Sequence, residues 1–465
     1  MFEKLANIFR VPDLRKRVLF TLAMLAVYRL GSHIPTPGIN ASALEQLFNQ
    51  SRGSFLGLLD IFNGGNVRRF TIFALGIMPY ITSSIILQLL TVVYEPLAKL
   101  QKEGELGRKK ITMWTRYLTA VLSALQSLGI AVSLERSSVG TQLVVNPGVG
   151  FVLMAMLTLT AGSVFIMWLG EQITKRGIGN GMSLLIFAGI VAGLPRGVLD
   201  LWDKARTGAW GGSFTPIAIA AVIAMMILVV AFIIYVERSE RRIRVEYAKR
   251  VVGRRVMGGQ STHLPLRVNA GGVMPVIFAS SVLTFPAMIG SGFFQNNRYF
   301  HAVSDWLAYG EPLYTFLYCV GIIFFAYFYV SIVFNPNEVA DNMRKYGGFV
   351  PGIRPGRRTA DYINEILTRI TLVGGLYLIL VSLIPQFMIT GTHLNHLWGP
   401  IGDFFANLPT WVTNGLGVNF YFGGTSLLIV VGVAMDTIQQ IESQLIMRHY
   451  EGFTPRSGRI KGRRW

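Results

Sequence analysis

Apolar residues are grouped along the chain in ten long runs, and the polar and charged residues are concentrated between them. A helix needs about 20 mainly apolar residues to cross the roughly 30 Å hydrocarbon core of a bilayer. Runs of this length therefore predict membrane-spanning helices. The ten runs lie at residues 18–34, 70–93, 111–134, 150–170, 182–201, 216–236, 272–290, 313–334, 370–389 and 421–441.

A shorter apolar stretch, residues 54–62, precedes the second run, and Asn63, Gly64, Gly65 and Asn66 separate the two. Nine residues in a helix rise about 14 Å, so this stretch is too short to span. The second run is too polar and kink-prone for a face turned wholly to lipid, since it contains Gly76, Pro79, Thr82, Ser83, Ser84 and Gln88. Two interpretations remain open. Either a re-entrant helix is joined by a glycine hinge to a pore-lining helix, or an interfacial helix precedes an ordinary packed span.

The composition favours a polytopic membrane protein. Hydrophobic residues make up 52% of the 465 residues and charged residues only 14%, and the mean hydropathy is +0.47. The single cysteine, Cys319, excludes an internal disulfide framework and a cysteine metal site. The formal net charge of +19 has to lie in the connections, because cations inside a bilayer are costly.

Lysine and arginine are concentrated in every second connection between the apolar runs. The N-terminal segment and every second connection hold 33 of the 43 basic residues. Because basic residues stay on the cytoplasmic side, this asymmetry predicts that both termini are cytoplasmic. The N-terminus has mixed charge and no cleavage pattern, so we expect it to be retained. The predicted organisation is a cytoplasmic segment 1–17, an N-terminal half 18–201, an external connection 202–215, a C-terminal half 216–441 and a basic cytoplasmic tail 442–465.

Two cytoplasmic loops, residues 237–269 and 335–368, are longer than a simple connection requires. Apolar and basic residues alternate from Arg242 to Val256, which predicts a hairpin, and residues 349–356 are rich in turn formers. We expect both loops to protrude. Basic loops commonly just fix orientation and contact anionic lipid, whereas nine basic residues in one structured loop favour an acidic partner such as RNA or an acidic protein surface.

The sequence lacks the signals of several kinds of chemistry. It has no phosphate-binding loop, and its six histidines show no metal-ligand spacing on a spanning helix. The glycine-rich residues 177–181 are expected to open the helix that follows them. Ion-coupled transporters place carboxylates at the midplane, and the second, fifth and seventh runs have none. We therefore expect no enzyme and no cofactor, which leaves a passive conduit or a carrier of uncharged solutes.

Five separated motifs closely resemble the bacterial SecY family of protein-conducting channels. They are residues 73–81 (FALGIMPYI), 170–174 with 177–181 (GEQIT and GIGNG), 260–265 (QSTHLP), 350–356 (VPGIRPG) and 421–425 (YFGGT). The likeness runs from about Leu14 to Met447. The external connection 390–419 departs from it, being longer than we expect of the family.

The resemblance implies an all-α polytopic membrane protein with ten transmembrane helices. They form two inverted five-helix halves around a central pore, with a re-entrant plug helix at about residues 54–66. The halves are expected to open about the connection between spans five and six. Such a channel passes unfolded secretory polypeptides across the bacterial plasma (inner) membrane and releases transmembrane helices sideways into lipid.

The resemblance also implies four groups of site residues, matched by motif position. The pore ring would be Ile77, Met78, Ile81, Met182, Ile186, Ile277 and Ile429, and the family usually has isoleucine where Met182 stands. The plug would be Phe55, Leu56, Leu58, Leu59, Ile61 and Phe62. The lateral gate would be Thr82, Ser83, Ser280, Ser281 and Phe285. Partner docking would use Arg241, Arg242, Lys249, Arg250, Arg254, Arg255, Arg354 and Arg357.

The positions of these residues agree with an apolar ring around the pore and with a seam between the second and seventh spans. Ile77 and Ile81 are four residues apart, so they lie side by side on one helix face, and a dry apolar constriction stops ions by dewetting. We expect hydroxyl side chains of the second and seventh spans to form weak bonds across the seam between them. For each of these residues, ordinary packing inside a helical bundle is the simpler alternative.

The partners expected of such a channel are SecE-type and SecG-type small membrane subunits, a SecA-type motor ATPase, the ribosome, signal sequences, nascent chains and membrane lipids. Two other classes of protein compete with the channel hypothesis. One is a small-solute secondary transporter with inverted repeats, and the other is an intramembrane enzyme. The protruding basic loops favour the channel.

Overall fold

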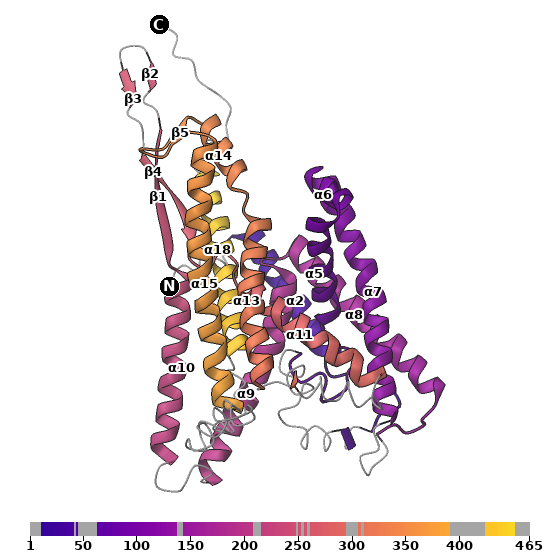
Figure 1. Cartoon of the computed structure of the whole chain (residues 1–465). Helices are drawn as coiled ribbons and strands as arrows, with labels where there is room; N and C mark the ends of the chain where they lie inside the picture. The colour runs from indigo at the N-terminus through magenta and orange to yellow at the C-terminus, as the bar shows by residue number, and fades with distance from the viewer. Residues whose placement is uncertain are drawn as a thin grey trace.

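A computed structural model of the chain describes residues 11–40, 43–44, 63–136, 143–207, 215–247, 250–252, 255–257, 261–293, 306–307, 311–390 and 424–451. Long helices dominate this part of the chain, and a small β-structure lies beyond one end of them (Figure 1). In Figure 1, α5, α6, α7 and α8 form one group of helices, and α10, α13, α15 and α18 form a second group.

Each of the ten apolar runs overlaps a helix. These helices are α2 (Pro12–Gly31), α5 (Met78–Val93), α7 (Glu105–Arg136), α8 (Val149–Arg176), α9 (Gly181–Thr207), α10 (Thr215–Glu237), α11 (Met274–Phe293), α13 (Pro312–Val333), α15 (Arg357–Thr390) and α18 (Gly424–Glu451). Two shorter helices, α6 (Glu95–Lys102) and α14 (Pro336–Lys345), lie in connections.

By length and composition, five helices within the described residues can cross a membrane, or six if α5 and α6 count as one bent span. The chain is thus built as a multi-pass helical membrane protein. A total of ten spans in two inverted halves stays a prediction.

The prediction for the second run is wrong at its beginning. We expected a helix over residues 70–93, but residues 63–77 form turns and α5 begins only at Met78. Phe70 and Gly76 have positive φ angles of 45° and 57°, which are incompatible with a right-handed helix. Pro79 stands in the first turn of α5, where a missing N–H costs nothing. The chain also bends by 103° between α5 and α6.

The first long loop, residues 237–269, forms the predicted hairpin, and its pairing reaches further than the alternating pattern. Strand β1 (Glu240–Tyr247) pairs antiparallel with β4 (Ser261–Arg267), from Glu240 opposite Arg267 to Glu246 opposite Ser261. Strands β2 (Arg250–Val252) and β3 (Arg255–Met257) pair at the tip. In Figure 1 this tip lies beyond the ends of the helices.

The second long loop packs against the first. Its strand β5 (Gly348–Phe349) pairs with Glu246 and Tyr247 of β1 and completes a three-stranded sheet. Below the sheet, Ile243, Leu266 and Val350 form a buried cluster with Ile363 of α15. This apolar contact fixes the sheet near the N-terminal end of α15, as the burial of apolar surface favours.

Candidate channel site

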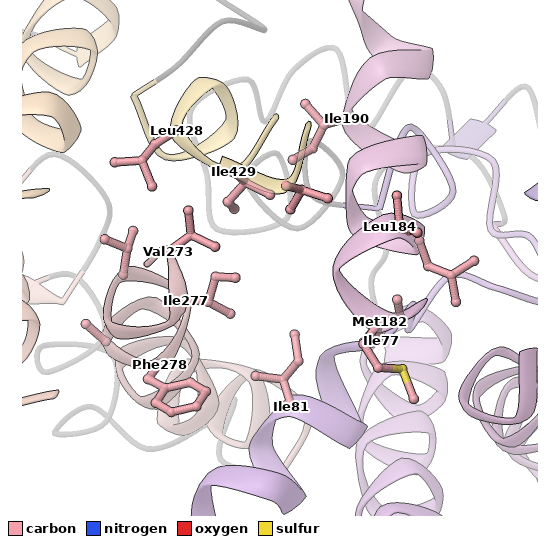
Figure 2. Packing of buried hydrophobic residues seen from close by; sticks show 14 of the residues in the cluster. Ile77, Ile81, Met182, Leu184, Ile190, Val273, Ile277, Phe278, Leu428 and Ile429 are labelled. Atoms are coloured by element: carbon pink, nitrogen blue, oxygen red, sulfur yellow. The ribbon is translucent and has the colours of Figure 1, made fainter. Parts of the chain in front are cut away.

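One pocket between the helix groups is lined by residues from four helices and the turn before α5. It has an empty volume of about 330 Å³. Figure 2 shows Ile81, Ile277 and Ile429 converging on this space from α5, α11 and α18. The pocket is lined by Asn63, Ile77, Met78, Ile81, Ile186, Ile277, Ser280 and Ile429. Six of the seven residues assigned to the pore ring are in this set.

Four of the five isoleucines that line the pocket are buried, and Ile186 is partly buried. Ile77, Ile81 and Ile277 are 6%, 8% and 6% exposed, and Ile429 is 1% exposed. Ile77 caps the N-terminus of α5 and Ile81 follows one turn later, so both face the same side. All four belong to one buried cluster that joins helices of the two groups. An apolar lining of this kind holds water poorly.

Met182 is placed differently from the other ring candidates. It is absent from the residues that line the pocket, and it is 8% exposed. Its thioether lies against α8, because a methyl group added at Gly170 would come within 2.4 Å of its sulfur. The flexible side chain fills the space that this glycine leaves between α8 and α9. Ile186, one turn later on α9, reaches the pocket.

The sequence argument missed Asn63 as a lining residue. Asn63 is 5% exposed, and its side-chain Nδ2 donates a hydrogen bond to the carbonyl oxygen of Ala74 at 2.8 Å. Eleven residues separate the two partners, and the intervening turns have no periodic pattern from which this contact could have been predicted. The six residues assigned to the plug, Phe55, Leu56, Leu58, Leu59, Ile61 and Phe62, lie outside the described residues.

The hydroxyl groups assigned to the lateral gate form different hydrogen bonds from those that were expected. In the described residues, all four donate to carbonyl oxygens of their own helix and none donates across the seam. Thr82 donates to Met78 at 3.0 Å and Ser83 to Pro79 at 2.7 Å, and Ser280 and Ser281 both donate to Ile277, at 2.9 and 2.7 Å. Serine and threonine in helices commonly bond back to a carbonyl three or four residues earlier. Weak bonds across the seam were therefore the wrong prediction.

The two helices that were expected to form the lateral gate, α5 and α11, are in contact. Helix α11 contacts both α5 and α7. Thr82, Ser83 and Ser281 are all buried. For Phe285 the structure describes the backbone in α11 and not the side chain. The seam between α5 and α11 is thus closed by packing of helix surfaces, with its hydroxyls already satisfied within each helix.

Four of the eight residues assigned to partner docking have described side chains, and they lie on β1 and around the start of α15. Arg241 and Arg242 are exposed on β1, Arg354 is exposed in the turn before α15, and Arg357 is exposed as the first residue of α15. No described residue forms an ion pair with Arg354. Arg250 and Arg255 lie on β2 and β3, where only the backbone is described, and Lys249 and Arg254 lie outside the described residues.

Several long-range polar contacts between helices were not predicted from the sequence. Arg116 of α7 forms two hydrogen bonds of 2.6 Å with Glu171 of α8. The backbone N–H of Gly179 donates to Gln440 of α18 at 2.9 Å. The expectation that residues 177–181 open a helix is confirmed, since α9 begins at Gly181 and Asn180 accepts a hydrogen bond from the Met182 N–H at 3.1 Å.

Comparison with solved structures defines the class of fold. The structure described as "The structure of a protein conducting channel" matches with a TM-score of 0.64 at 16% identity, over 95% of this chain and 94% of that chain. "Sec61 in the Canine ribosome-channel complex from the endoplasmic reticulum" matches with a TM-score of 0.60 at 16% identity, with the same coverage of both chains. The fold is therefore that of protein-conducting channels.

The sequence comparison is more specific. The family model described as SecY matches residues 71–438. The protein translocase subunit SecY of Escherichia coli K12 is 48% identical over 94% of this chain and 93% of that protein. That of Streptomyces galbus is 47% identical over 97% of this chain and 100% of that protein. The chain belongs to the SecY family.

Proposed function

We propose that this chain is the pore-forming subunit of a protein-conducting channel that passes unfolded secretory polypeptides across the membrane. The function follows from its family, whose curated relatives are named protein translocase subunits, and from its fold. One observation carries the placement of the pore. Residues from four helices that are far apart in the sequence, and that motif position assigns to a ring, line a single apolar pocket.

The chemistry of the pocket suits a seal that a polypeptide can open. Ions require hydration, and an isoleucine-lined constriction offers neither water nor charge. Apolar contacts are not directional, so the same side chains can close around many different polypeptide sequences. In this proposal the resting pocket excludes ions, and a transported chain takes the place of the contacts that close it.

The proposal extends to a lateral exit between α5 and α11. A signal sequence is an apolar helix, and it would take the place of the helix packing that closes this seam. Because the four described gate hydroxyls donate within their own helices, parting the two helices breaks none of these four hydrogen bonds. The apolar segment 54–62 would close the external side of the pocket as a plug.

The partners follow from the exposed cytoplasmic arginines and from the comparisons. Two similar structures are of ribosome-bound complexes, the canine one and "Cryo-EM structure of idle yeast Ssh1 complex bound to the yeast 80S ribosome". We place ribosome and SecA-type motor docking on the cytoplasmic sheet and on Arg354. The chain itself would form ten spans in the bacterial inner membrane, with both termini cytoplasmic, and SecE-type and SecG-type subunits would complete the complex.

A secondary transporter for small solutes is not favoured. A solute site needs polar groups placed to bind its substrate, and the pocket offers one amide, Asn63, and one hydroxyl, Ser280, among six apolar residues. The Ser280 hydroxyl already donates to its own helix. The protruding basic sheet also has no evident use in such a transporter.

Reconstitution tests the proposed function. Vesicles holding the chain with its small subunits are supplied with a SecA-type motor, ATP and a precursor that carries a signal sequence. Protection of the precursor from external protease is expected, and a precursor without its signal sequence should stay accessible. Equal protection of the two precursors, or of neither, would contradict the proposal.

A further inference from the structure

The turn between β5 and α15 restrains the two neighbours of Arg354. Val350 is 5% exposed and belongs to the buried cluster with Ile363 of α15. The backbone N–H of Ile353 donates to the Val350 carbonyl oxygen at 3.1 Å, and the Ile353 side chain packs against the same cluster. Pro355 follows Arg354 and favours an extended backbone at the residue before it. The turn thus leaves Arg354 exposed between two restrained residues.

Thr359 of α15 adds a hydrogen bond to the Arg354 backbone itself. Thr359 is 2% exposed, and its Oγ1 donates to the Arg354 carbonyl oxygen at 3.0 Å. In the part of the chain that the structure describes, no backbone N–H donates to this oxygen. The Thr359 N–H donates to the Gly356 carbonyl oxygen, also at 3.0 Å. One residue of the helix thus holds two positions of the turn.

This hydrogen bond differs from that of Thr371, further along the same helix. The Thr371 hydroxyl donates to the Leu367 carbonyl oxygen at 2.8 Å, four residues earlier and inside α15. Threonines in helices commonly bond back in this way. The Thr359 hydroxyl instead reaches back five residues, past the first residue of α15, to the turn. It therefore links the helix to the turn.

The surroundings of Arg354 do not hold its side chain. Within the described residues, no carboxylate forms an ion pair with it. Arg357 and Arg358 are exposed in the first turn of α15. A methyl group added at Gly356 would lie 3.9 Å from a guanidinium nitrogen of Arg344. Because these like charges repel the guanidinium of Arg354, its position depends on the backbone from which it extends.

We propose that Thr359 is a positioning residue for motor docking: its hydroxyl holds the Arg354 backbone so that the guanidinium meets a carboxylate of the SecA-type motor. This inference rests on the proposed function, in which Arg354 belongs to the docking surface. Arginine pairs with a carboxylate in a fixed bidentate geometry, so a restrained backbone lowers the cost of ordering the side chain on binding. RNA is bound mainly through charge summed over many side chains, so ribosome binding depends less on this one hydrogen bond.

The test measures binding of the motor to the reconstituted complex in vesicles. Thr359→Val keeps the shape of the side chain and removes the donor. It should weaken motor binding by roughly three- to tenfold, the range by which one net hydrogen bond shifts an equilibrium. Thr359→Ser keeps the donor and should bind the motor within about twofold of the parent. Ribosome binding should stay within about twofold of the parent in both variants.

A second background separates positioning from general stability. Arg354→Ala removes the guanidinium, so nothing is left for Thr359 to position. This change alone should weaken motor binding. Adding Thr359→Val to it should cause no further loss, because the two changes act on one contact. A merely structural role of Thr359 would give the same loss in both backgrounds.

Thr371→Val is the matched control. Thr371 is 4% exposed, lies on the same helix and also donates to a backbone carbonyl oxygen. Because its hydrogen bond lies inside α15, its change should lower the thermal midpoint and leave motor binding at the parent level. If Thr359→Val does not accumulate in the membrane, Thr359→Ala decides, since it removes the donor without placing a methyl group against the carbonyl oxygen.

Four results would overturn the inference: parent-level motor binding without the Thr359 hydroxyl, parent-level binding by Arg354→Ala, an undiminished loss when the two changes are combined, or an equal loss in Thr371→Val. Equal weakening of ribosome binding would contradict the assignment to the motor. Transport of a normal precursor by the parent is measured in the same vesicles. Its absence would contradict the channel function itself, whereas normal transport by the parent with unchanged motor binding in Thr359→Val would contradict only the role of Thr359.

Discussion

The pocket and the three-stranded sheet of β4, β1 and β5 are built from opposite kinds of residue. Isoleucines from four helices converge in the pocket, and none of the eight residues that line it is charged. Along β1, the buried Ile243 and Val245 alternate with the exposed Arg242 and Arg244, so one face packs on the protein and the other carries charge. The sheet is fixed on α15 through Ile363.

In the proposed function, this difference separates sealing from docking within one chain. Apolar packing in the pocket is not directional and accepts many sequences, whereas exposed arginines favour acidic partners and are screened by salt. β4 leads within a few residues into α11, which supplies Ile277 and Ser280 to the pocket. The two regions are thus chemically distinct and directly joined along the chain.

The largest effect should come from joining α5 to α11 covalently. Cysteines at Thr82 and Phe285, in a background with Cys319 replaced by serine, should form a disulfide. Because a closed seam admits no signal sequence, oxidation should block precursor transport almost completely, and a reductant should restore it. Gel mobility after cleavage between the two halves measures the crosslink.

Each single-cysteine variant serves as a control, since it meets the same oxidant without forming the internal bond. Should the disulfide form fully and transport continue, α5 and α11 would be packed neighbours and not a gate. That result would leave the docking role of the sheet intact and remove only the lateral exit.

Charge reversal on the docking surface should have the next largest effect. Arg354 is exposed before α15, and Arg354→Glu places like charge against an acidic partner. Such juxtaposition costs several kcal/mol, so motor-driven transport should fall roughly a hundredfold or more while membrane insertion is unchanged. The measurement is the rate of precursor protection, together with motor binding to the vesicles.

Arg108→Glu is the matched control, since Arg108 is exposed in the first turn of α7, outside the sheet. It should keep the parent rate within about twofold, as the small effects typical of exposed charges suggest. A parent-level rate in the variant Arg354→Glu would remove this residue from the docking surface.

A smaller effect is expected from hydrating the pocket. Ile429→Asn introduces an amide into the apolar lining, and resting iodide influx should rise by roughly tenfold because the constriction then holds water. Val433→Asn is the control. Val433 is 4% exposed one turn along α18 and does not line the pocket, so its change should lower stability without a leak. Equal leaks in the two variants would show that position 429 has no special place in the seal.

Much of the fold could be predicted from apolar run length, because the bilayer sets the length of a spanning helix. The hairpin also followed from the alternation between Arg242 and Val256. The beginning of α5 could not be predicted, since the apolar residues from Phe70 to Gly76 suit a helix and only positive φ angles exclude one. This stretch is held by contacts of Phe73 with Tyr28 and Phe165, which are distant in the sequence, and by the contact of Gly76 with Asn63.

The same distinction holds within the candidate site. Ile77, Ile81 and Ile429 were assigned by motif, and isoleucine is too common in membrane helices for its type alone to mark a pore. Asn63 and the pair of Arg116 with Glu171 depend on tertiary contacts. The seam hydroxyls were predicted with the wrong partners, because side chains of this kind satisfy themselves within their own helix.

The central claim is that the apolar pocket is the path of the transported polypeptide. A precursor is stalled during transport by a folded C-terminal domain, and it carries one cysteine in its translocating segment. Complexes carry a single cysteine at position 429 or at 433, with Cys319 replaced by serine. The account predicts a disulfide between precursor and channel for Ile429→Cys and none for Val433→Cys. Equal crosslinking at the two positions, or none at 429, would contradict it.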